Sequence, residues 1–484
     1  MRKWKPAADP RNQGAWLALS NFHPTPRGTY RTAPILVANG TATSVGGTPG
    51  TTIAALALPS TDGTVRTIVG TSTKLYGATA SAFQSGSFTD LSKVGGYTAS
   101  TWSVIQYGNI TIAANKTDAT QFRDATTANA FADLAGAPQA KILVVCALSV
   151  VAFNLSTAAN SWAASDVGDY TNWTTGDAVT ATPILDCPGE ITAAIAFSDN
   201  VIIVFKKNSI YRMEYVGFPI YWRVDLIDEG RGVTAMHAVV KCGNVLIFSG
   251  EHGTTLFDGS GFRDLDDGFE LNSGSLLAFT NAATAAVYLP TEKSAVFASA
   301  VDATVYNMTS DSWGNFGLYK NGESVSAGGY VLLQGPPSAR LTAMGVSTRT
   351  ISEAGLCFVN LSANPCVLKT DKAWTPHSSI TASLTTSWMG DERTMTLWGR
   401  VTPLSANAEN YATASATGLT MTGNLNDVPS TQGAMSVSSV TSSTATNRFD
   451  ILKSSRFARF TPAVTGAFYE IADVAVDAKP AGTE

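Results

Sequence analysis

The succession of short apolar runs between Gly189 and Gly259 constrains the fold more than any other part of this sequence. Four runs rich in β-branched and aromatic residues are separated by polar or glycine-containing turns: residues 191–197, 201–205, 210–215 and 222–227. Runs of this kind are typical of strands, and such short turns join antiparallel neighbours. The pattern starts again at Met236. A four-stranded antiparallel sheet that recurs along a chain predicts the blades of a β-propeller.

The same unit recurs through much of the chain. An aromatic residue marks a strand of six successive units: Tyr76, Phe122, Phe153, Tyr211, Phe257 and Tyr306. The first and last are 230 residues apart, a mean repeat of 46 residues, which fits the period of roughly 40–50 residues for four-stranded blades. We therefore expect an all-β chain with a propeller of about six four-stranded blades, a seventh being left open. The aromatic residues are interpreted as packing between neighbouring sheets, because no blade covers its own apolar faces.

The rest of the chain divides into three segments around this propeller, which is assigned to residues 51–320. Residues 1–50 are polar and proline-rich, which predicts an extended N-terminal arm lying against the propeller or a neighbouring subunit; a disordered leader is the alternative. Residues 321–377 form a closing blade or a linker subdomain, and a strand from the arm could also close the ring. Alternating runs in residues 378–484 predict a C-terminal β-sandwich-like domain, whose Ser/Thr/Gly-rich residues 418–447 form a long hairpin or a loop.

Composition limits the partners of this chain. Charged residues make up 14% of it, against roughly 25% in ordinary globular proteins. A surface with so few charges suits a subunit buried against partners, and the alternative is a Ser/Thr-rich β-protein adapted to a particular habitat. The net charge of −5 argues against a basic-patch nucleic-acid binder, although an acidic channel would let DNA pass without adhering.

The cysteines and the N-terminus indicate the compartment. Five scattered cysteines without a CxxC pair argue against a disulfide framework or a zinc site. Cys357 and Cys366 could bridge a loop, but we expect two buried thiols. The N-terminus lacks an apolar signal core, and the longest apolar run, residues 142–153, is too short to span a bilayer. We expect a chain made in the cytosol, with no membrane insertion.

No arrangement typical of an enzyme is found. The four histidines are far apart, and no HExxH, GxSxG or P-loop motif occurs. One acidic group stands out, comprising Asp258, Asp264, Asp266, Asp267 and Glu270. A glycosidase needs two carboxyl groups that converge from different elements, about 5–10 Å apart, and these residues share one Gly/Asp-rich stretch. We interpret them as a solvated loop, and predict no catalytic residue, no cofactor and no metal site.

Residues 189–215, with Glu229-Gly-Arg-Gly-Val233 and the terminal run 456–476, resemble the tail nozzle proteins of short-tailed bacteriophages, also called packaged-DNA stabilisation proteins. The order of arm, propeller and C-terminal β domain is similar as well. The resemblance implies a virion tail protein without catalytic residues. It implies a homo-oligomeric ring of six copies, docked under the portal and adaptor proteins and near tail fibre, spike or needle components. Double-stranded DNA would leave through that ring.

Two segments are candidates for a gate that retains the last DNA in such a ring. The first is the acidic loop of residues 264–270, with Asp264, Asp266, Asp267 and Glu270 facing the lumen, and the second is residues 418–447. Two other functions stay open at this point. One is a propeller that binds or cleaves glycans, and the other is a propeller scaffold for protein partners.

Overall fold

A computed structural model describes most of the chain: residues 3–4, 15–33, 36–38, 52–61, 63–79, 88–127, 129–251, 253–265, 285–298, 302–317, 330–335, 357–360, 367–370, 381–390, 394–404, 419–426, 435–441, 449–465, 470–471 and 473–483. Strands and turns account for these residues, and no helix occurs among them. The predicted all-β class is confirmed. The helix suggested for residues 269–279 lies outside the described residues.

Six consecutive four-stranded antiparallel meanders form most of the propeller. Blade one contains β6 (Thr52–Pro59), β7 (Val65–Thr71), β8 (Leu75–Thr79) and β9 (Thr89–Asp90). Blade two contains β10 (Ser103–Tyr107), β11 (Ile110–Ala114), β12 (Gln121–Asp124) and β13 (Ala132–Asp133). Blade three contains β14 (Ala140–Cys146), β15 (Ser149–Leu155), β16 (Ser161–Ala164) and β17 (Val179–Pro183).

The next three blades repeat this order. Blade four contains β18 (Ile191–Ala196), β19 (Val201–Lys206), β20 (Ser209–Gly217) and β21 (Tyr221–Glu229). Blade five contains β22 (Val239–Cys242), β23 (Val245–Gly250), β24 (Gly253–Phe257) and β25 (Phe262–Asp264). Blade six contains β26 (Ala285–Leu289), β27 (Ser294–Ala298), β28 (Asp302–Asn307) and β29 (Ser312–Gly317).

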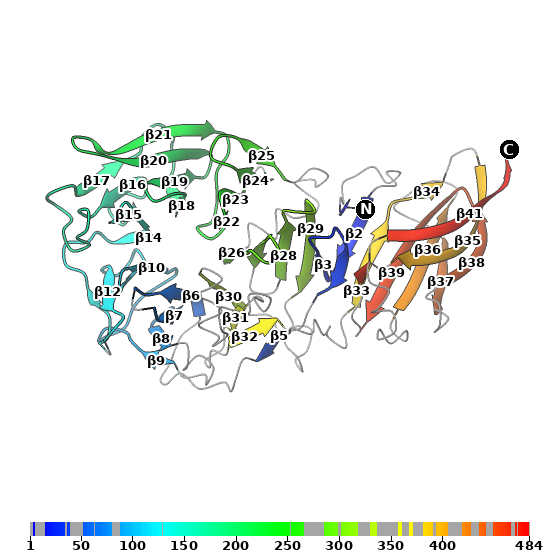
Figure 1. Ribbon diagram of the computed structural model, residues 1–484, viewed down its shortest axis with the longest axis horizontal. Helices are drawn as coiled ribbons and strands as arrows, with labels where there is room; N and C mark the ends of the chain where they lie inside the picture. Colours follow the sequence, from blue (N-terminus) through cyan, green and yellow to red (C-terminus); the bar gives the residue numbers. More distant parts are fainter. Residues whose placement is uncertain are drawn as a thin grey trace.

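A seventh blade closes the circle. It contains β30 (Tyr330–Gln334), β31 (Cys357–Asn360), β32 (Val367–Thr370) and, as its outer strand, β5 (Leu36–Ala38) from the N-terminal segment. The innermost strands contact one another in sequence order, and β30 returns to pair in parallel with β6. Figure 1 shows the sheets radiating from one centre. Within the described residues the propeller therefore has seven blades, the higher of the two counts that the sequence left open.

The N-terminal segment also joins the propeller to the C-terminal domain. Its strands β3 (Phe22–Pro24) and β4 (Tyr30–Thr32) extend blade six outward from β29, and the C-terminal strand β40 (Glu470–Ile471) pairs with β4. Strands β1 (Lys3–Trp4) and β2 (Ala15–Ser20) join a sheet of the C-terminal domain instead. The N-terminal arm therefore pairs with both the propeller and the C-terminal domain of its own chain.

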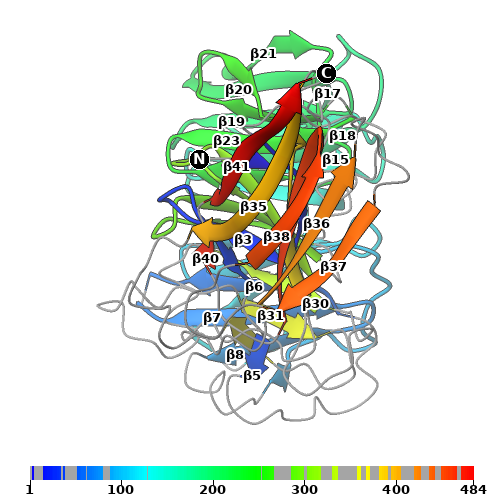
Figure 2. The ribbon, with the colours of Figure 1, turned by 90° about the vertical axis from the view of Figure 1, so that its right-hand side faces the viewer.

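The C-terminal domain is a β-sandwich beside the propeller (Figures 1 and 2). One sheet has β33 (Thr381–Thr386), β34 (Met389–Gly390), β39 (Phe457–Thr465), β36 (Leu419–Asn426) and β37 (Met435–Thr441), together with β1 and β2. The other has β38 (Phe449–Ser455), β35 (Thr394–Leu404) and β41 (Asp473–Thr483). Trp398 of one sheet and Phe460 of the other lie 6.1 Å apart between ring centres, at a near-perpendicular angle that aromatic pairs favour.

One apolar cluster runs from the sandwich into the propeller. It joins Trp398 and Phe460 to Trp16 of β2, Tyr30 of β4 and Tyr306 of blade six, all buried. Burial of such large side chains is the main source of stability in a fold of this kind. Among the described residues, the junction between propeller and sandwich is therefore a continuation of one core.

The aromatic residues found in the sequence repeat pack as predicted. Five of the six are buried: Tyr76, Phe153, Tyr211, Phe257 and Tyr306. Phe122 is partly buried and packs against the cluster between blades two and three. Phe153 lies on the second strand of its blade, however, while the others lie on the third. The third strand of blade three carries Trp162 at the position that pairs with Phe153.

The turns between the first two strands of several blades depend on glycine. Gly108 and Gly243 adopt positive φ angles of 58° and 68°, which cost glycine little because it has no Cβ atom. Asn109 uses its side-chain oxygen to accept a hydrogen bond from Ser60 of the preceding blade, at 2.6 Å.

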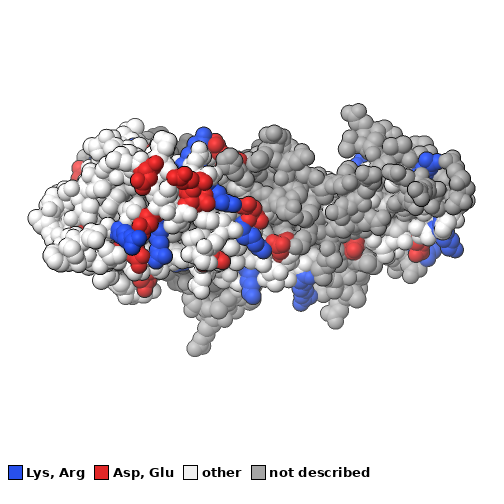
Figure 3. Space-filling view, turned by 90° about the horizontal axis from the view of Figure 1, so that it is seen from above, with Lys and Arg blue, Asp and Glu red and all other residues white. Residues whose placement is uncertain are grey.

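The surface seen in Figure 3 carries acidic and basic side chains beside one another. The pairs Arg212–Glu214 and Arg223–Asp225 on blade four have N–O distances of 3.0 and 2.8 Å. Within the described part of the chain, no helix is long and apolar enough to cross a membrane. Cys146, Cys187 and Cys242 are free thiols, and Cys366 lies outside the described residues.

Candidate functional site

Asp264 is the one member of the predicted lumen group that the structure describes. It ends β25 at the outer edge of blade five and is well exposed. One of its oxygens accepts a hydrogen bond from Thr255 Oγ1 at 3.1 Å, and the other lies 3.5 Å from Arg231 Nη2. Asp266, Asp267 and Glu270 lie outside the described residues.

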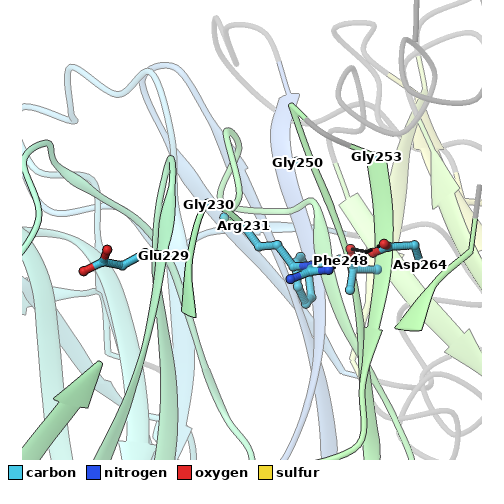
Figure 4. Close-up of a pocket in the computed structure, with 9 residues that line it drawn as sticks. Glu229, Gly230, Arg231, Phe248, Gly250, Gly253 and Asp264 are labelled. Carbon is cyan, nitrogen blue, oxygen red and sulfur yellow. Dashed lines mark hydrogen bonds and ion pairs between the residues drawn. The ribbon is translucent and has the colours of Figure 1, made fainter. Parts of the chain in front are cut away.

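Asp264 borders a cavity of about 270 Å³ between blades four and five. Glycines of two connections form much of its wall, and the side chains that reach it include Glu229, Arg231, Phe248 and Thr255. Arg231 lies over the ring of Phe262 and 3.1 Å from Asp228. Figure 4 shows Arg231 directed toward Asp264 while Glu229 points away from both.

Arg231, the cation among the lining residues, is paired with two carboxylates, Asp228 and Asp264. Desolvation alone would lower the pKa of Arg231, but the hydrogen bond and the negative charge of Asp264, together with Asp228, raise it. Because Glu229 points away from Asp264, these two carboxylates do not form the converging pair that glycoside hydrolysis requires. The cavity is an ion-paired cleft between two blades.

Asp258, in the turn that precedes β25, has a structural role. Asp258 Oδ1 accepts hydrogen bonds from the backbone N–H of Ser260 and Gly261, at 2.9 and 2.8 Å. These bonds, with one from the Ser260 hydroxyl, lower the pKa of Asp258. The residue stabilises the turn between β24 and β25, as short Asx side chains commonly do.

The hub of the propeller holds a second cavity of about 180 Å³. Its wall comes mainly from the inner strands, with Leu56, Ile142 and Ile195 among the lining side chains. His237 Nδ1 lies 3.3 Å from Gln334 Nε2. Burial among the inner strands, and then the positive charge of Lys141, lower the pKa of His237 to about 4. No Asp or Glu lines this cavity among the described residues.

The second predicted gate segment, residues 418–447, contains two sheet strands. β36 pairs with β39 on one side and with β37 on the other. The hairpin alternative is therefore correct for the described parts of this segment. No group of three or more His, Cys, Asp or Glu side chains that could hold a metal occurs within the described ranges.

One exposed apolar hairpin end of the described chain was not predicted from the sequence. The end of β20 and the turn to β21 expose Val216, Phe218 and Ile220, and Phe218 is 84% exposed. We call these three side chains the apolar tip. The segment from Tyr215 to Trp222 has no charged residue, and that feature could have identified it. The strand pattern drew attention to the runs on either side instead.

The arrangement defines a β-propeller protein with a C-terminal sandwich. No family model matches this sequence, and no curated protein matches it either. Solved structures with some likeness include the computationally designed Ika8 protein, with 12% identity and a TM-score of 0.39 over 70% of this chain and 100% of that one. YCF48 bound to D1 peptide has 11% identity and a TM-score of 0.40 over 70% and 97%.

A third similar structure is PorZ of Porphyromonas gingivalis, with 9% identity and a TM-score of 0.38 over 76% of this chain and 44% of that one. At these identities the likeness concerns the fold alone. The succession of sheets around one centre is what defines the propeller here.

Proposed function

We propose that this chain is a structural virion protein that forms the distal tail nozzle ring of a short-tailed bacteriophage. Six copies would surround a passage that retains packaged DNA and then releases it. The portal and adaptor proteins would lie above the ring, and tail fibre, spike or needle components beside it. The chain would be made in the host cytoplasm and act in the virion, without a cofactor.

The observation that best supports a mechanical role is the way the arm ties the chain together. Strands from residues 1–38 lie in the sandwich, in blade six and in blade seven, and β40 returns to blade six. Such pairing holds propeller and sandwich as one body, because separating them would break sheet hydrogen bonds and expose a shared core. A ring that withstands DNA pressure needs subunits of this kind.

The charge of the chain supports a passage for DNA. With a net charge of −5, the subunit repels phosphates at long range, so a lumen made from it would not hold DNA by adhesion. The gate in this proposal remains with residues 264–270 or with the hairpin of β36 and β37. Heterologous contacts that close by rotation would build the ring.

Sedimentation and negative-stain electron microscopy of the purified full chain test this proposal. We expect closed rings of six copies that leave double-stranded DNA unbound at low salt. A chain that stays monomeric at about 100 μM, well above ordinary assembly concentrations, would contradict it. A glycan array and a hydrolysis screen on the same sample distinguish the glycan-binding alternative, which predicts a ligand for the monomer.

A further inference from the structure

The apolar tip lies at the end of the long hairpin of β20 and β21, at the upper left of Figure 1 and far from the sandwich. Its three side chains, Val216, Phe218 and Ile220, are 47%, 84% and 65% exposed. Single exposed apolar residues are normal on protein surfaces, but a group of three on one turn marks a contact with something else.

The base of the hairpin is held in the core, so the tip is a rigid projection. Trp222 is buried and lies 5.4 Å from Tyr215 between ring centres. The hydroxyl of Tyr215 donates to Asp177 Oδ2 at 2.7 Å. The ring of Phe218 packs edge-on against Tyr221 at 6.2 Å. The exposed side chains are therefore displayed at fixed positions.

Two backbone contacts close the turn. Gly217 pairs with Tyr221 across the hairpin, the N–H of Trp222 donates to the carbonyl of Ile220 at 2.8 Å, and Pro219 has no N–H. A segment that enters a medium without water needs its polar backbone groups satisfied internally. These contacts satisfy part of that requirement, which is less strict in the interfacial layer than in the bilayer core.

The charged residues that flank the tip along the chain are paired, and Asp177 at the base accepts the hydrogen bond of Tyr215. The nearest charged residues along the chain are Glu214 and Arg223, and each is paired on its own strand, with Arg212 and Asp225 respectively. Eight residues between them carry no charge. The tip thus presents neither positive nor negative charge to a partner, which favours contact with an electrically neutral surface.

We propose that the apolar tip enters the interfacial layer of a neutral, zwitterionic lipid surface. Phe218 and Ile220 would reach the acyl boundary, with the partly exposed Tyr215 and Tyr221 near headgroup level, where amphipathic aromatic side chains are favoured. This contact is peripheral and differs from the bilayer insertion that the sequence argues against. It does not depend on the proposed nozzle role.

A lipid surface fits the tip better than a second copy of the chain. A stable protein interface buries about 800 Å² on each partner, far more than three side chains provide. A convex projection also needs a matching apolar pocket. Of the two cavities described above, one contains Arg231 between carboxylates and the other lies inside the hub. A lipid layer adapts to the shape of the projection and needs no pocket.

Vesicle flotation with the full chain tests the proposal. Wild-type protein should float with phosphatidylcholine vesicles, and 1 M salt should change the bound fraction less than about twofold because no charge pair is involved. The double variant Phe218→Ser/Ile220→Ser should reduce the bound fraction at least about fivefold. Phe218→Gln alone, a milder change, should lower it in the same direction.

The matched control is Leu185→Ser. Leu185 is 74% exposed and lies in the connection from β17 to β18, which the up-and-down strand order places on the opposite face of the propeller from the tip. This variant should float like the wild type. Absence of flotation, or equal loss in Leu185→Ser and the double variant, would overturn the proposal. So would a drop in assembly mass in the double variant without any lipid binding, since that result indicates contact with a second copy.

Discussion

Gly70 lies in β7 against the indole of Trp102, which is buried between blades one and two. A Cβ atom at position 70 would meet Trp102 Cδ1 at 2.5 Å, and the indole cannot retreat freely because its N–H donates to the carbonyl of Thr71 at 2.8 Å. Gly70→Ala should therefore lower the free energy of unfolding by about 1–3 kcal/mol, measured by urea denaturation. Gly261→Ala, where a Cβ atom meets nothing within 4 Å, is the control. Equal urea midpoints for the two variants would contradict the close packing of Gly70 against Trp102.

His237 gives the hub a pH dependence. Its pKa is about 4 in the folded protein, lowered by burial and by Lys141, against roughly 6.5 when unfolded. Between these values the unfolded state binds more protons, so stability is full above pH 6.5 and falls toward pH 4. We expect His237 to account for a loss of about 1–2 kcal/mol, less than full burial would give because the ring faces a cavity.

The variant His237→Gln isolates this effect. It keeps a polar group near Gln334 but does not titrate, so its urea midpoint should fall less steeply than that of the wild type between pH 6.5 and 4. His23, whose pKa burial and Arg31 also lower, titrates equally in both proteins and cancels in the comparison. If the urea midpoints of the wild type and the variant fell in parallel between pH 6.5 and 4, the imidazole of His237 would not be desolvated in the hub.

At the scale of elements, β2 is the strand on which the junction depends. Trp16 is fully buried in the cluster shared by the sandwich and blade six. Trp16→Ala should lower the free energy of unfolding by about 3–5 kcal/mol, since it leaves a cavity in a core that cannot fully collapse. Ala18→Ser on the same strand, at an exposed position, should change it by less than about 0.5 kcal/mol. Urea denaturation of both variants measures the difference.

Sequence patterns predict the blades that are continuous in the chain, because each strand is an apolar run with a turn at both ends. The run predicted at residues 201–205 corresponds to β19 (Val201–Lys206), for example. Pairings between distant segments carry no such local pattern. β5 joins β32, which lies more than 300 residues later, and β40 joins β4. The closing strand could be suggested from the sequence, but its partner could not.

The candidate site was predicted less well than the fold. Sequence proximity grouped Asp258 with Asp264, yet one carboxylate stabilises a turn and the other pairs with Arg231 from the preceding connection. The packing of neighbouring blades decides which side chains an acidic residue contacts. The spacing of residues along the sequence does not show this packing. The exposure of Phe218 is hidden for the same reason, since an aromatic residue in a strand-rich stretch is usually buried.

The whole molecule has a propeller and a sandwich, but its core does not divide in the same way. Tyr306 of blade six, Trp16 of the arm and Phe460 of the sandwich belong to one cluster. At the same junction Arg31 Nη2 lies 2.9 Å from Glu292 Oε1, and Thr29 donates to Glu470. Contacts of this kind couple the unfolding of both parts, because neither can open without exposing the other.

We therefore expect one calorimetric transition for the full chain. Phe460→Ala in the sandwich and Phe205→Ala in blade four each remove a fully buried ring, at a cost of about 3–5 kcal/mol. For a chain of this length each should lower the same transition by about 3–5 °C. If the two parts melted independently, two peaks would appear and each variant would move only one of them. A shared shift would show that the propeller and the sandwich unfold as one cooperative unit.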